Sequence, residues 1–159
     1  MTTTRPLITA GVTLGIGMGG FVDGIVFHQL LQVHNMVSAK RPPDTVVNLE
    51  INMVWDGLFH CLTWLATAAG IWLLWRAMKR SDVPRQGRTL AGAMIMGWGA
   101  FNLTEGVIDH HVLHVHHVVE RLGPSVWDWV FLGSGAALMV AGFGLVRMDR
   151  VRAPEPGAR

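Results

Sequence analysis

Residues 7–31 read LITAGVTLGIGMGGFVDGIVFHQLL, an apolar, glycine-rich stretch with an acid and a histidine toward its end. A helix of about 20 apolar residues crosses a hydrocarbon core of about 30 Å, so this stretch is long enough to span a membrane. It is too long for the apolar part of a signal peptide, and no small-residue cleavage site follows it. Three further stretches of this kind cover residues 51–75, 90–112 and 126–146. We therefore predict an all-α integral membrane protein, a four-helix bundle.

The composition supports one membrane domain and no separate soluble domain. Half of the 159 residues are hydrophobic and 15% are charged, against about 25% charged in soluble domains. The single cysteine, Cys61, rules out an intramolecular disulfide, and the scattered charges do not indicate nucleic-acid binding. We expect residues 1–150 to form one transmembrane domain in contact with the lipid bilayer. Residues 151–159, with their Pro and Arg residues, are expected to form a disordered cytoplasmic tail.

The basic residues predict the orientation in the membrane. Ten of the thirteen Lys and Arg residues lie before the first stretch, between the second and third, or after the fourth. Cytoplasmic loops carry an excess of Lys and Arg. Both termini and the middle loop are therefore predicted to be cytoplasmic, while the loops around Lys40 and Gly123 face outward.

The chain also contains a repeated pattern. Asp23-Gly24 is followed by His28 and His34, and Glu105-Gly106 is followed at the same spacing by His110 and His116. A Trp-Asp pair occurs in each of the other two stretches, at residues 55–56 and 127–128. Two spans per unit predict two related helical hairpins in a parallel repeat. Glycines along the helices predict close packing within one chain or between chains, so homo-oligomer formation is left open.

Carboxylates occupy the outer half of every predicted span. A carboxylate inside a span costs several kcal/mol unless it is paired, protonated or coordinated. All eight histidines lie at the same depth or further out, and none lies on the cytoplasmic side. Imidazole and carboxylate together bind divalent first-row metals, and helix bundles build such sites from inward-facing side chains. We therefore predict a transition-metal site near the outer face. The acids concerned are Asp23, Asp56, Glu105, Asp109 and Asp128.

The predicted ligands follow from α-helical geometry. His28, His60 and His110 are expected to bind the metal directly. Asp56 and Glu105 are expected to be ligands or to orient the imidazoles from outside, as second partners of metal-bound histidines do. His114 lies on one α-helical stripe with His110 and His117, whereas Asp23 and His28 are about 140° apart around an α-helix and need not bind the same atom. The remaining members of the layer are Asp23, Asp109 and Asp128.

A simpler interpretation exists for several of these residues. A single histidine buried in a membrane is more often a hydrogen-bonded helix contact than a ligand, and we expect this of His34 and His111. An alternative for His116 and His117 is that they are simply solvated loop residues. The whole cluster could also be a buried polar network without metal.

Three segments resemble a known family. They are residues 21–28 (FVDGIVFH), 55–60 (WDGLFH) and 105–117 (EGVIDHHVLHVHH). Together they resemble the domain-of-unknown-function family 2243, small predicted bacterial membrane proteins, over residues 11–147. The resemblance implies a place in the bacterial cytoplasmic (inner) membrane. Through a loose association with genes for haem-copper oxidase assembly, it also implies copper handling, with a respiratory oxidase or its assembly factors as partners.

Two classes of function follow. The favoured one is a membrane protein that binds a transition metal for storage, delivery or sensing, with copper favoured and iron or zinc as alternatives. The other is a membrane metalloenzyme, di-iron or zinc, or a haem-binding protein with two axial histidines. A di-iron enzyme of the hydroxylase kind needs several separate histidine clusters, and only one dense cluster, facing outward, is present. The apolar cytoplasmic halves of all four spans argue against an ion or proton pathway.

Overall fold

A computed structural model describes residues 2–152, and these residues form helices and connecting loops without any strand. Four long α-helices dominate, and two of them continue into π-helices, labelled η1 and η2. The elements are α1 (Arg5–Val22), η1 (Asp23–Leu30), α2 (Val46–Met78), α3 (Gly87–Glu105), η2 (Gly106–Val112), the short 3-10 helix η3 (Glu120–Leu122) and α4 (Val126–Arg152). The predicted all-α class with four long helices is confirmed. The predicted tail is helical at residues 151–152, while residues 153–159 lie outside the described residues.

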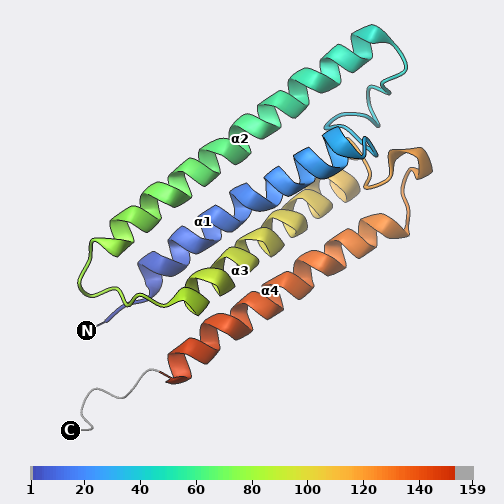
Figure 1. Ribbon diagram of the computed structural model, residues 1–159. Helices are drawn as coiled ribbons and strands as arrows, with labels where there is room; N and C mark the ends of the chain where they lie inside the picture. The colour runs from blue at the N-terminus through green and yellow to red at the C-terminus, as the bar shows by residue number, and fades with distance from the viewer. Residues whose placement is uncertain (1, 153–159) are drawn as a thin grey trace, which may run out of the picture.

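The four long helices lie side by side in the order α2, α1, α3, α4 (Figure 1). Helix α1 packs between α2 and α3, and α4 packs on the other side of α3. The N-terminal end, the loop between α2 and α3, and the end of α4 lie at one end of the row, where most of the Lys and Arg residues also lie. The loops after η1 and η2 lie at the opposite end, which we call the outer end.

Three helical segments are long and apolar enough to cross a membrane: Arg5–Leu30, Val46–Met78 and Val126–Asp149. Helix α3 does not meet the same criteria, although it runs beside the others (Figure 1). Its position explains this composition, because its polar residues Thr89, Asn102 and Glu105 are buried against neighbouring helices. The edge helices instead expose large apolar side chains such as Trp64 on α2 and Phe143 on α4, as lipid contact requires.

Glycines allow the middle helices to approach closely. A Cβ atom on Gly15 of α1 would overlap the Met94 carbonyl group of α3. A Cβ atom on Gly99 of α3 would lie 2.6 Å from the carbonyl oxygen of Gly135 on α4. Such small residues are typical of helix contacts in membranes. The glycine faces found in the sequence therefore serve packing inside the chain at these positions.

Helices α1 and α3 change from α to π geometry where they reach the outer end. Each π-helix closes with a backbone hydrogen bond over five residues, from Leu31 N to Val26 O (2.8 Å) and from Leu113 N to Ile108 O (2.7 Å). A residue with positive φ then turns the chain, Gln32 at 50° and His114 at 48°. Neither residue is a glycine, so each turn costs about 1–3 kcal/mol that the surrounding structure must supply. The turns send both loops back over the ends of α1 and α3.

Candidate metal centre

Six buried side chains meet at the outer end of α1 and α3. Ligand atoms lie within 4.8 Å of one another in each of three overlapping groups: His28 with His34 and His116, Glu105 with His110 and His116, and Asp23 with His28 and Glu105. Because these groups share members, they form one site. We call it the six-residue cluster: Asp23, His28, His34, Glu105, His110 and His116.

The π-helices decide which side chains on one helix can meet. In a π-helix the backbone bonds run from residue i to i+5, so residues five apart stack on one face. Asp23 and His28 are five apart in η1, and His28 Nε2 lies 3.0 Å from Asp23 Oδ2. α-Helical geometry would place them about 140° apart, and the π-helix instead brings their side chains together. Glu105 and His110 have the same spacing, at the junction of α3 and η2.

His34 and His116 enter the cluster from the two loops. Their rings are stacked, with centroids 4.7 Å apart. His34 Nδ1 donates to the Val118 carbonyl and His116 Nδ1 to the Met36 carbonyl, both at 3.0 Å. A carbonyl oxygen only accepts, so Nδ1 carries the proton and the Nε2 of a neutral ring is free to bind a metal.

The alternative in which His116 is a solvated loop residue is wrong. Its exposed fraction is 0%. Burial, with a smaller effect of His34 and His110, holds the pKa of the His116 imidazole well below its usual range, so the ring is neutral at pH 7. The same alternative is wrong for His117, which is buried too.

Asp56 and Asp128 lie outside the cluster, beside its histidines, and only Asp56 is hydrogen-bonded to one of them among the described residues. Asp56 Oδ1 accepts from His28 Nδ1 at 2.9 Å and from Met36 N at 2.8 Å. Asp128 Oδ1 accepts from Val118 N at 2.9 Å and lies 3.5 Å from His110 Nδ1. Carboxylates that bond the far nitrogen of a metal-binding imidazole fix its orientation. Of the two roles considered for Asp56, the structure supports this orienting one.

The cluster leaves many polar atoms without partners. Among the described residues, buried atoms with no hydrogen bond include Nε2 of His28, His34, His110 and His116, Asp23 Oδ2, and both Glu105 carboxylate oxygens. An unpaired buried polar group costs about 1–3 kcal/mol, and a charged group more. His28 Nε2 and Asp23 Oδ2 lie within ion-pair distance of each other, at 3.0 Å. A cation bound within one of the three groups would give several of these atoms a partner. The donors present therefore fit a metal ion.

Besides Asp56 and Asp128, three further predicted site residues lie outside the cluster. His60 Nδ1 is bonded to the Asp56 carbonyl at 2.8 Å, and its ring fills the space that a Cβ atom on Gly24 would need. Asp109 is only half-buried and His114 is exposed. The predicted α-helical stripe from His110 through His114 to His117 is wrong, because η2 is a π-helix that ends at Val112. His111 is a hydrogen-bonded helix contact as expected, with Nδ1 2.6 Å from the Gly106 carbonyl oxygen.

The two loops bind each other above the cluster. Ala39 N donates to the Val115 carbonyl, and Glu120 N donates to the Val33 carbonyl, both at 3.0 Å. Glu120 Oε2 also accepts from Ser38 Oγ at 2.9 Å and from His117 N at 3.1 Å. Because each loop carries one histidine of the cluster, this pairing positions His34 and His116 together.

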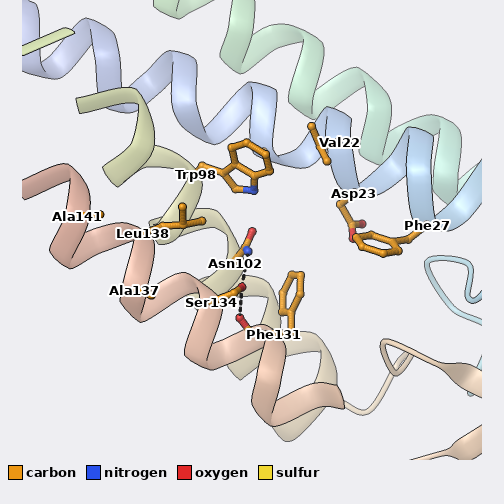
Figure 2. A pocket seen from close by; sticks show the side chains of 11 residues that line it. Val22, Asp23, Phe27, Trp98, Asn102, Phe131, Ser134, Ala137, Leu138 and Ala141 are labelled. Atoms are coloured by element: carbon orange, nitrogen blue, oxygen red, sulfur yellow. Dashed lines mark hydrogen bonds between the residues drawn. The ribbon is translucent and has the colours of Figure 1, made fainter. Parts of the chain in front are cut away.

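An apolar cavity of about 520 Å³ reaches the cluster from the side (Figure 2). Asp23 lies at one end of it, and aromatic side chains from three helices line it: Phe27 of η1, Trp98 of α3 and Phe131 of α4. Asn102 donates to Ser134 Oγ at 3.0 Å in the same wall. The cavity thus joins one carboxylate of the cluster to a space suited to apolar molecules.

Comparison with known proteins places the chain in a family. A family model described as a predicted membrane protein, DUF2243, matches residues 10–149. The chain belongs to the DUF2243 family. This confirms the resemblance seen in residues 21–28, 55–60 and 105–117. These three segments contain every residue of the six-residue cluster except His34. No curated protein and no solved structure matches this DUF2243 chain.

Proposed function

We propose that this DUF2243 protein binds a transition-metal ion in the six-residue cluster and handles that ion at the outer face of the bacterial cytoplasmic membrane. The observation that carries the proposal is the convergence of buried imidazole and carboxylate atoms without hydrogen-bond partners among the described residues. His28, His34, His110 and His116 would bind through Nε2, and Asp23 and Glu105 through carboxylate oxygens. Asp56 and Asp128 would orient His28 and His110.

The two hairpins contribute alike to this site. Each supplies one acid and one histidine from a π-helical region, one histidine from the following loop, and one orienting Asp from the next helix. Even the loop contacts match, since His34 bonds a carbonyl of the second loop and His116 bonds a carbonyl of the first. These matches support an internal parallel repeat, with the metal bound between the two units.

The donor set narrows the choice of ion. The cluster offers nitrogen and oxygen but no sulfur, because Cys61 is exposed elsewhere on α2. Imidazole suits copper, iron and zinc, and carboxylate suits harder ions. Two carboxylates match the charge of one divalent cation. Copper is the first ion to test, because the family resemblance implies a link to oxidase assembly. A respiratory oxidase or its assembly factors would then receive the ion.

Haem is less well supported than a bare ion. The cluster rings have centroids only 4.5 Å apart for His28 and His34, and 4.8 Å apart for His110 and His116. A porphyrin needs open space around its two axial ligands. Here neighbouring imidazoles and carboxylates fill that space.

Metal analysis tests the proposal directly. Tag-free protein purified in detergent without chelator is expected to contain near-stoichiometric copper, iron or zinc by inductively coupled plasma mass spectrometry. Chelator should remove the ion, and readdition should restore it. A protein that holds no copper, iron or zinc even after reconstitution with each would contradict the proposal and favour a metal-free polar network.

The apolar cavity favours a second candidate function, a metalloenzyme that acts on a membrane-soluble molecule. Its lining residues Val22, Ala137 and Ala141 are exposed on the flank of the helix row, where lipid surrounds the protein. An alkyl hydroxamate, which joins an apolar chain to a metal-binding head, is a suitable probe.

In this second function, the hydroxamate should bind metal-loaded wild-type protein in nanodiscs and perturb the metal spectrum. Ala137→Trp fills the cavity and should abolish hydroxamate binding without changing the metal content. Ala136→Trp, on the neighbouring exposed position of α4, is the matched control and should bind normally. Failure of the wild type to bind the probe would leave metal handling as the better account.

A further inference from the structure

The two hairpins differ in the residues around their equivalent histidines. In the first hairpin, Gln29, Gln32 and Asn35 follow His28. At the same spacings after His110, the second hairpin has three histidines instead, His111, His114 and His117. None of these three belongs to the six-residue cluster. The second hairpin therefore supplies all three additional histidines.

Two of these additional histidines, His111 and His114, border a cavity that leads to the cluster. The cavity measures about 330 Å³ and is lined by His110, His111, His114, Ser125 and Asp128, among others. His114 is exposed at the outer end, whereas His110 is buried in the cluster. The cavity therefore connects a histidine in solvent to a histidine of the proposed metal site.

Intermediate groups are spaced closely enough to pass an ion inward. The rings of His114 and His117 have centroids 5.6 Å apart. His117 Nδ1 is buried without a hydrogen bond among the described residues and lies 3.3 Å from Asp128 Oδ2. The other oxygen, Asp128 Oδ1, lies 3.5 Å from His110 Nδ1. Nitrogen and oxygen donors thus follow one another from the surface to His110, whose Nδ1 and Nε2 are both buried without a hydrogen bond among the described residues.

The equivalent carboxylate of the first hairpin, Asp56, has closer hydrogen-bond partners than Asp128 has among the cluster-side histidines. Asp56 accepts from His28 Nδ1, Met36 N and Asn35 Nδ2, all within 2.9 Å. Asn35 occupies the position equivalent to His117, and its side-chain amide donates a hydrogen bond to the Asp56 carboxylate. Asp128 instead accepts from two backbone N–H groups, of Val118 and Ser125, and its contacts with both histidines are longer.

We propose that metal ions enter the six-residue cluster through the second hairpin, passing from His114 to His117 and Asp128 and then to His110. The inference rests on the proposed function, because it needs a metal-binding cluster at the end of the route. An ion that moves along these groups always keeps imidazole or carboxylate ligands, which suit first-row transition metals. It is therefore never left unligated in the apolar part of the protein.

The test measures the rate of metal uptake separately from the amount bound. Apoprotein is mixed with Cu²⁺, or with the ion identified in the purified protein, and quenching of tryptophan fluorescence follows the uptake. Metal content at equilibrium is then measured by mass spectrometry. The variant His114→Gln/His117→Asn installs the residues of the first hairpin at the two equivalent positions. We expect uptake at least tenfold slower than in the wild type, with unchanged stoichiometry.

Two further variants distinguish entry through the second hairpin from entry elsewhere. Gln32→Asn changes the equivalent turn of the first hairpin and should take up metal at the wild-type rate. His114→Gln alone changes an exposed side chain and should slow uptake in a correctly folded protein. Unchanged rates in both histidine variants, or equal slowing in Gln32→Asn, would overturn the route. Loss of stoichiometric metal in the double variant would also overturn the route, because it would show that these histidines are ligands of the bound ion. Absence of metal from the wild type would instead refute the proposed function itself.

Discussion

Replacing His116 with Gln is expected to remove stoichiometric metal binding, although His116 lies in a loop and outside every predicted membrane span. His116 belongs to two of the three groups of close ligand atoms, so its loss affects both halves of the cluster. Loss of a residue that only orients a ligand lowers metal affinity about 10–100-fold, and loss of a ligand should exceed this. Metal content after dialysis against a weak chelator measures the effect.

His60→Gln is the matched control for this experiment. His60 is a histidine at the same end of the molecule, but its Nδ1 bonds the Asp56 carbonyl and its ring packs on Gly24. The variant should keep its metal and lose only packing stability. Metal retained in His116→Gln and lost in His60→Gln would contradict the cluster and support the ligand list predicted from the sequence.

Replacing Glu105 with Gln is expected to abolish stabilisation by metal while leaving the apoprotein at least as stable as the wild type. A ligand present at 100 times its Kd stabilises the folded state by about 2.7 kcal/mol, which should raise the melting temperature of the wild type. In the variant this gain is lost with the ligand. The apoprotein is not destabilised, because both Glu105 carboxylate oxygens are buried without hydrogen-bond partners among the described residues. Burying a neutral amide there costs less free energy than burying a carboxylate.

Thermal unfolding followed by tryptophan fluorescence, with and without metal, measures both quantities. Asp109→Asn makes the same chemical change nearby on a half-buried carboxylate that is outside the cluster. It should respond to metal like the wild type. A normal metal-dependent shift in Glu105→Gln would show that Glu105 is not a ligand, and a collapse of the apoprotein would show that the carboxylate has a structural role.

Sequence patterns locate the site more reliably than they assign its ligands. Asp23, His28, Glu105 and His110 stand out because acids and histidines inside apolar spans are costly and share one depth. His34 and His116 follow the helices, so burial inside a span does not indicate them. One signal could have included them: His34 follows His28 at the same distance as His116 follows His110. Residues that recur in this way in both hairpins are better candidates than His60, whose counterpart next to the second Trp-Asp pair is Leu132.

Composition and the length of the apolar stretches are enough to establish that this protein is all-helical, that its helices suit a membrane, and that its polar residues gather at one end. Each of these properties follows from the residues of single segments of the chain. Which polar residues meet depends instead on the three-dimensional fold. A π-helix changes the angle between Asp23 and His28, and two loops that bond each other bring His34 and His116 together. Such contacts depend on backbone geometry and on segments far apart in the chain, so no local pattern of residues specifies them.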